Sequence, residues 1–392
     1  AARRLADIAL LERASGSERR RGSITIRRRV FELLVESSLQ GLALNLPPPL
    51  GKTAAEPLAI RIARTNSVQS EALQRFQIQR LPPRGDAVMI SIGRNLNGVI
   101  VRAREGERMV VDRGALSFNE RTPALDRPGI VIAGSLPYLD LDHWRPLLTG
   151  GEGSALSLAA LNLDIGVLDF AGRRIDELKL RATRAKGQWS ANVDARELAG
   201  DIAWRPEGRG RIVARLRHLT VPGAAPDPVV DEARSRELPA LDVTADRFVL
   251  GNLELGRLEL VAVNEARDWR IERLVLATPE STLSADGYWQ SWAARPSTNL
   301  NLKLEVSDAG KYLERMGYPG TVRGGSAHLE GKVGWAASPQ TIHYPTLTGN
   351  VALRVEKGQF LKADPGAAKL LGILSLQSLL TFDLRDLFSE GF

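Results

Sequence analysis

The most constraining feature of this chain is an alternation of apolar and polar residues that recurs along much of its 392-residue sequence. One example is Leu161, Leu163 and Ile165, which are separated by Asn162 and Asp164. Successive side chains of a β-strand point to opposite faces, so this spacing places the apolar ones together on one face. A strand with one polar face is typical of antiparallel sheets, because parallel strands buried on both faces have continuous apolar runs.

Several other stretches have the same alternation, and together they predict a mainly β fold. The chain contains few aromatic residues, so we expect aliphatic side chains to build the apolar face. The residues predicted to line that face are Leu161, Leu163, Ile165, Leu178, Leu180, Ala182, Leu241, Val243, Phe248, Leu250, Leu258, Leu260, Leu300, Leu302, Leu304, Val351 and Leu353.

Helical signals are few and short. One helix is expected after Asp142 as N-cap, and another is expected between the N-cap Asp308 and the terminating Gly317. A third is expected over residues 364–380, where Asp364 precedes a proline at the first helical position. So few helices cannot cover the apolar face of some twenty strands, and an uncovered apolar face of that size is normally a binding surface or an aggregation hazard.

The third helix is unusually apolar, because its leucines and isoleucine go most of the way round it. We expect this helix either to gate one end of the apolar surface or to cap an exposed sheet edge. The residues concerned are Leu370, Leu371, Ile373 and Leu374.

Two stretches of the sequence match each other without gaps at an offset of 80 residues. Leu161 corresponds to Leu241, Leu180 to Leu260, and the register continues as far as a second tryptophan. We therefore expect a repeated β-unit over about residues 161–204 and 241–289. Repeated β-units that bury their apolar faces by stacking produce an elongated body.

Most of the formal charge of +7 is confined to the start of the chain, where nine arginines and three acidic residues lie within residues 1–30. Aromatic side chains do not interleave with these arginines, as single-strand nucleic-acid binding would favour. We therefore expect residues 1–34 to be a separate Arg-rich segment with a solvated, irregular terminus, and we expect no nucleic-acid partner.

Motifs for catalysis or metal binding are weak. The absence of cysteine excludes disulfides, thiol nucleophiles and Cys-ligated metals. Residues 47–53 resemble part of a phosphate-binding loop, but Leu46 occupies the position that needs its first glycine. The histidines are too widely spaced to predict a shared metal. We expect no catalytic residues, no metal and no cofactor.

The sequence also contains no run of about 18 to 20 apolar residues, the length that a membrane-spanning helix requires. It has neither an initiator methionine nor the pattern of a signal peptide. We therefore expect the chain to be part of a longer protein.

Four segments carry a resemblance to a known family. Residues 308–335, DAGKYLERMGYPGTVRGGSAHLEGKVGW, resemble a hallmark of the AsmA-like superfamily, and residues 349–392 resemble its YhdP branch. Residues 134–144 and 39–52 also resemble that branch, so the resemblance covers about residues 35–392. The Arg-rich start matches no pattern of the family, and the family's amino-terminal membrane helix is missing here.

The resemblance implies a long, twisted antiparallel sheet that curls into a taco-like apolar groove. It further implies a periplasmic protein of a Gram-negative envelope, anchored in the inner membrane through a segment absent here. Phospholipids would be its cargo, with a membrane at both ends, possible envelope protein partners and a role in outer-membrane integrity. Two alternatives are an envelope scaffold that carries no lipid and a lipid or polysaccharide hydrolase, which would need ionisable groups pointing into the groove.

Overall fold

The computed structural model describes residues 13–17, 21–27, 30–74, 76–93, 95–149, 158–222, 238–265, 268–290, 296–337, 339 and 343–361. Of these residues, 64% lie in strands and 7% in helices, so the fold is mainly β as predicted. The chain divides into two compact units, unit 1 (Ala1–Arg196) and unit 2 (Glu197–Phe392), each of which is described separately below.

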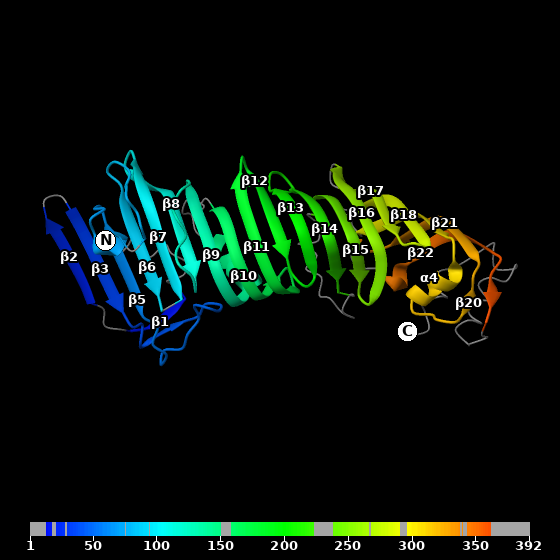
Figure 1. Ribbon diagram of the computed structural model, residues 1–392, viewed down its shortest axis with the longest axis horizontal. Coiled ribbons are helices and arrows are strands. Elements are labelled where there is room, and N and C mark those ends of the chain that lie inside the picture. Colours follow the sequence, from blue (N-terminus) through cyan, green and yellow to red (C-terminus); the bar gives the residue numbers. More distant parts are fainter. Residues whose placement is uncertain are drawn as a thin grey trace. The chain divides into compact units, whose positions relative to one another are not determined.

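Unit 1 contains one large sheet, whose strands lie side by side in the order in which the chain forms them (Figure 1). Its strands are β2 (Arg21–Arg27), β3 (Val30–Ser37), β5 (Ile60–Thr65), β6 (Asp86–Ile92), β7 (Leu96–Glu105), β8 (Arg108–Phe118), β9 (Gly129–Asp140), β10 (Leu158–Phe170), β11 (Arg173–Ala185) and β12 (Gln188–Asp194). A separate two-stranded sheet joins β1 (Ala14–Gly16) to β4 (Leu42–Leu44), and two helices are α1 (Glu71–Gln74) and α2 (Leu141–Thr149).

Unit 2 is also built on one large sheet. Its strands are β13 (Leu198–Arg205), β14 (Arg211–Val221), β15 (Ala240–Leu250), β16 (Leu253–Glu265), β17 (Asp268–Ala277), β18 (Ser281–Gln290), β19 (Ser297–Val306), β21 (Ser326–Trp335) and β22 (Thr348–Glu356). A small second sheet joins β20 (Val322–Arg323) to β23 (Gln359–Phe360). The helical elements are α4 (Ala309–Arg315) and the 3₁₀ turn η2 (Tyr344–Thr346).

Strand pairing is mixed, which refines the expectation of an antiparallel sheet. Most neighbours are antiparallel, but β9 pairs in parallel with both β8 and β10, and β14 pairs in parallel with β15. Parallel neighbours need a crossover rather than a tight hairpin, and the segment between β9 and β10, which begins with α2, provides one. Alternation alone could not distinguish these parallel pairs from antiparallel ones, because a strand with one polar face has the same sequence pattern in either orientation.

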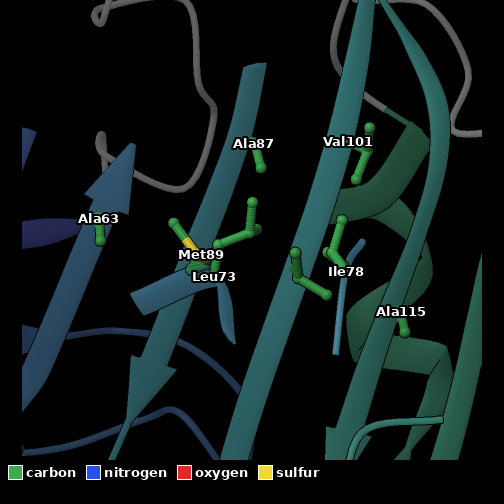
Figure 2. Packing of buried hydrophobic residues seen from close by; sticks show 8 residues of the cluster. Ala63, Leu73, Ile78, Ala87, Met89, Val101 and Ala115 are labelled. Carbon is green, nitrogen blue, oxygen red and sulfur yellow. The ribbon is translucent and has the colours of Figure 1, made fainter. Parts of the chain in front are cut away.

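The core of unit 1 lies between its sheet and the segment that contains α1. Leu73 and Ile78 from this segment pack against the sheet residues Ala63, Ala87, Met89, Val99, Val101 and Ala115 (Figure 2). Ala63, Met89, Val99 and Ala115 lie directly opposite one another on β5, β6, β7 and β8, so they share one face of the sheet. One face of these strands is therefore covered by the protein itself.

The helix α4 matches its prediction closely. Asp308 is its N-cap and accepts a hydrogen bond from the Lys311 amide at 3.1 Å. The helix ends at the cap residue Met316, and Gly317 follows with a φ of 93° that suits glycine.

The helix α2 also forms, but its capping differs from the prediction. Asp140, rather than Asp142, accepts a hydrogen bond from the His143 amide at 3.0 Å. The Asp142 carboxylate instead accepts hydrogen bonds from the amides of Ala171 and Gly172 in the turn between β10 and β11.

The Arg-rich start is partly regular. The expectation of an irregular terminus is wrong for residues 21–27, which form β2 and pair with β3 along their whole length. The predicted helix over residues 364–380, including Leu370, Leu371, Ile373 and Leu374, lies outside the described residues.

Candidate functional site

The candidate site is the face of each large sheet that carries the predicted lining residues, called here the candidate face. Residues directly opposite each other on neighbouring strands point to the same face, so the strand registers determine which side chains share it. Leu161 lies opposite Ala182, Leu163 opposite Leu180, and Ile165 opposite Leu178. The structure therefore brings these predicted residues together on one face.

In unit 1, a row of opposite residues crosses the sheet from β2 to β12 and contains only glycine and aliphatic side chains. This unit 1 row consists of Gly22, Val35, Ile62, Ile90, Gly98, Leu116, Ile132, Leu161, Ala182 and Ala191. Several of these side chains, among them Ile62, Ile90 and Leu161, are only partly buried. The candidate face of unit 1 thus presents partly accessible hydrocarbon on most of its strands, although Ala182 is buried and two positions are glycine.

The next row in the same sheet faces the other way and is almost entirely polar. It consists of Arg21, Glu36, Arg61, Ser91, Asn97, Ser117, Ala133, Asn162, Arg181 and Asn192. Side chains in or beside it pair with each other, as Arg181 does with Asp164 at 2.7 Å. This row is therefore polar where the unit 1 row is aliphatic, although the same face also carries the covered core at Ala63, Met89, Val99 and Ala115.

Unit 2 has an equivalent unit 2 row from β13 to β22, again made of aliphatic residues and glycine. It consists of Ile202, Ala214, Val243, Leu260, Leu274, Ala285, Leu302, Gly331 and Val351. A second row on the same face places Leu304 between Leu283 and Leu329, with Leu353 beyond. Leu300 lies two residues before Leu302 on β19, on the same face and opposite Val333.

The predicted lining residues differ in burial. Those that are buried by neighbouring side chains are Leu163, Ile165, Leu178, Ala182 and Leu258. Those that are partly exposed are Leu161, Leu180, Leu241, Val243, Phe248, Leu260, Leu300, Leu302, Leu304, Val351 and Leu353. Leu250 is 42% exposed at the end of β15 and lies outside the two rows.

The sequence analysis missed other members of these rows. Ile60 and Ile62 flank Arg61, and Leu329 and Val333 flank a stretch with two charged residues. The alternation of apolar and polar residues was therefore present in the sequence, but each stretch was short. In β6 and β7 the alternation is hidden, because Met89 and Val99 are apolar residues of the covered core on the opposite face. Both faces of these strands carry apolar side chains, and a run without alternation does not reveal which face remains open.

One group of charged side chains interrupts the apolar character of the candidate face. Asp86 is buried and binds Arg64 at 2.5 Å and Arg102 at 2.8 Å. Burial opposes ionisation of Asp86, but the hydrogen bonds from Arg102 and Arg64 outweigh it and lower its pKa below the ordinary carboxyl value. The sequence analysis did not identify these residues.

A second linked group of ionisable side chains lies on β9 and β10. Tyr138 donates a hydrogen bond to Asp169 at 2.7 Å, which together with neighbouring charge raises the pKa of Tyr138 to about 12. Within the described parts of the chain, no group of three or more acidic residues or histidines could hold a metal ion. No helix of the described residues is long and apolar enough to cross a membrane.

The strand registers reproduce the 80-residue offset seen in the sequence. Leu161 pairs with Ala182 and with Ile132, and Leu241 pairs with Ala262 and with Ile212. Each residue of the second set stands 80 positions after its counterpart, and this holds for both the antiparallel and the parallel partner. The next strand pair keeps this offset, because Trp189 lies opposite Arg184 and Trp269 lies opposite Asn264. A bulge between Val261 and Ala262 then shifts the register between β16 and β17.

A family model described as "YhdP protein" matches residues 2–392. The chain belongs to the YhdP family. The match extends the resemblance, expected from residue 35 onward, back through the Arg-rich start. The intermembrane phospholipid transporter YhdP of Escherichia coli strain K12 is 22% identical over 383 residues, which cover 92% of this chain and 29% of that protein. The chain therefore spans less than a third of this YhdP relative. Comparison with solved structures finds no significant match.

Proposed function

We propose that this chain is part of a bridge-like phospholipid conduit, in which acyl chains slide along the apolar candidate face. The observation that supports this most directly is the pair of uninterrupted aliphatic rows, which cross the sheets of both units and remain partly accessible. At about 4.8 Å between strands, each row extends over roughly 40 Å. A surface of this length and composition fits hydrocarbon chains better than a compact ligand.

The energetics favour such a path. Burial of one CH₂ group stabilises by about 0.8 kcal/mol, so a 16-carbon acyl chain costs on the order of 12 kcal/mol to expose to water. A continuous aliphatic face removes most of that barrier. Because each row repeats similar side chains, neighbouring positions hold the chain with similar free energy, which allows sliding. In this proposal the sheet curls into a groove, and the polar headgroups project through its open side into water.

The relative named an intermembrane phospholipid transporter supports the cellular role that we propose. We place this chain in the periplasm of a Gram-negative envelope, anchored in the inner membrane through a part of the protein outside this sequence. Its ligands are phospholipids, its two ends face the two membranes, and envelope proteins are partners. Its transport supports outer-membrane lipid homeostasis and barrier integrity without a catalytic step.

The matching registers support a further part of the proposal. Residues 161–204 and 241–289 are two copies of one β-unit, and addition of such units lengthens the apolar path within a conduit over residues 35–392. Duplication would preserve the strand partners at the same offset, as the pairs of Leu161 and Leu241 do.

Photo-crosslinking tests which face carries the lipid. Crosslinkers at Leu180, Leu260 and Leu302 should capture phospholipid, whereas crosslinkers at Lys179 and Lys303 should not. The lysines are suitable controls because each neighbours a test position in sequence but points to the opposite face. Capture at the lysines alone would invert the proposed facing, and capture at neither set would contradict transport along the sheet.

Native mass spectrometry separates the conduit from a scaffold that binds no lipid. A conduit purified from its membrane-containing host should retain phospholipid, released as intact two-chain species on activation. A chain free of lipid after gentle purification, which also takes up none from added vesicles, would favour the scaffold.

A further inference from the structure

The charged group on the candidate face of unit 1 consists of Arg64, Asp86 and Arg102. Arg102 lies directly opposite Asp86 on the neighbouring strand. Arg64 lies opposite Val88, which is two residues after Asp86 on β6. Ile62 on β5 and Ile100 on β7 point to the same face as these charged residues, because each is two residues away on its own strand. All three therefore occupy positions that the alternation would otherwise give to apolar side chains.

The geometry holds the two guanidinium groups firmly. Nε of Arg64 lies 2.5 Å from Oδ2 of Asp86, and Arg102 donates through Nε and Nη2 to the two carboxylate oxygens, at 2.8 Å each. The side chain of Asp86 is 6% exposed, whereas those of Arg64 and Arg102 are 43% and 26% exposed. Arg64 also lies over the ring of Phe31, 5.5 Å from its centroid.

These contacts leave hydrogen-bonding capacity unused. A guanidinium has five N–H donors, and the bonds to Asp86 take one from Arg64 and two from Arg102. Both groups thus keep donors and exposed surface while their orientation is fixed.

The charges in the group do not balance. Two guanidinium groups share one carboxylate. Within the described residues, Arg64 and Arg102 form ion pairs with Asp86 and with no other acidic side chain. The adjacent Arg104 donates to the carbonyl of Gly106, and Asp112 is paired with Arg113. The group therefore carries one net positive charge on an otherwise apolar face.

We propose that Arg64 and Arg102 bind the phosphodiester of a phospholipid whose acyl chains lie on the neighbouring aliphatic side chains of unit 1. A phosphodiester carries the single negative charge that the group lacks, and arginine donors match its oxygen atoms in paired geometry. Val88, Ile90 and Ile100 lie beside the charged group on the same face and would contact the chains. Asp86 is a positioning residue that holds both guanidiniums toward the ligand. This site rests on the proposed lipid-binding function and adds a defined headgroup position to it.

Binding of three probes to the full chain tests the site. The probes are didecanoyl phosphatidylglycerol, didecanoylglycerol with the same chains but no phosphate, and glycerol 3-phosphate with the phosphate but no chains. We expect the native chain to bind the phosphorylated lipid about tenfold more tightly than didecanoylglycerol, and glycerol 3-phosphate only weakly. Tight binding of glycerol 3-phosphate would overturn the lipid assignment in favour of a site for free phosphate esters.

Arg64→Gln and Arg102→Gln should each reduce the preference for the phosphorylated lipid about tenfold and leave didecanoylglycerol binding unchanged. Arg61→Gln is the matched control, because Arg61 is on the same strand with a similar 41% exposure but lies in the polar row of the opposite face. It should retain the full preference. Circular dichroism and thermal unfolding establish that each variant is folded.

Asp86→Asn keeps both guanidiniums but removes the carboxylate that orients them, so the folded variant should lose part of its preference for the phosphorylated lipid, whereas didecanoylglycerol binding should stay unchanged. An unchanged preference in both glutamine variants, or no loss of preference with Asp86→Asn, would overturn the headgroup site. If didecanoylglycerol bound as tightly as the phosphorylated lipid to the native chain, the headgroup site alone would fail. If neither lipid bound, the proposed function would fail as well.

Discussion

At the scale of single residues, Gly134 shows how closely neighbouring strands approach on the candidate face. It lies opposite Leu163 on one side and Phe118 on the other, and its φ is +121°. A Cβ atom at this position would lie 1.9 Å from the carbonyl oxygen of Phe118. Only glycine fits, because both the backbone angle and the space exclude a side chain.

Gly134→Ala should therefore lower the free energy of unfolding by about 3 kcal/mol or more, measured by chemical denaturation. Gly172→Ala is the control, because Gly172 also has a positive φ, of +70°, but a Cβ atom added there would meet no other atom within 4 Å. This control should lose only about 1 kcal/mol, which is the cost of the backbone angle alone. Equal losses in the two variants would contradict the steric explanation.

Arg64, Asp86 and Arg102 mark the limit of sequence-based prediction at the residue scale. Each stands in phase with aliphatic neighbours, as Arg64 does with Ile60 and Ile62, so a charged residue at an apolar position was visible in the sequence. What the sequence could not show is that three such exceptions, on β5, β6 and β7, meet in one place. That depends on strand registers, which turns and distant pairings determine.

At the scale of elements, α4 was predictable because its local signals agree. A capping Asp308 and a terminating Gly317 enclose a short helical stretch, and both signals act within a few residues. The parallel pairs around β9 and the covering segment with α1 were not predictable, because they depend on contacts between distant parts of the chain. Asp142 illustrates the difference, since its carboxylate caps a turn about 30 residues away rather than its own helix.

The attachment of α4 to the sheet of unit 2 leads to a pH prediction. Arg315 of α4 binds the buried carboxylate of Glu280, and this hydrogen bond lowers the pKa of Glu280 despite its burial. Because the pKa is lower in the folded state, the pair stabilises the fold above the ordinary carboxyl value of 4.5, and this contribution is lost as the pH falls below that value.

Arg315→Gln should consequently destabilise the chain at pH 7 by about 3 kcal/mol and make less difference at pH 3, measured as unfolding free energy across that range. Lys311→Gln, on the same helix but with a 74% exposed side chain, is the control and should change stability little at either pH. A loss for Arg315→Gln that stays constant between pH 7 and pH 3 would contradict the proposed role of the ion pair.

At the scale of the whole molecule, one sequence rule explains the apolar surfaces of both units. Alternation predicted the candidate face wherever one side of a strand is polar, as around Leu161 and Leu302. It was less informative in β6 and β7, where the covered core makes both sides apolar. The division at Arg196 had no sequence signal, because strands with similar alternation lie on either side of it.

Because each unit has its own aliphatic row, we expect each to hold lipid independently. Leu180→Asp in unit 1 and Leu302→Asp in unit 2 should each remove part of the phospholipid found by native mass spectrometry, and the double variant should remove most of it. A charge on the open face repels hydrocarbon but can itself be hydrated, so the fold should persist. Lys179→Gln and Lys303→Gln, on the polar face, should retain native occupancy. A folded double variant with unchanged phospholipid occupancy would show that the aliphatic rows do not carry the lipid.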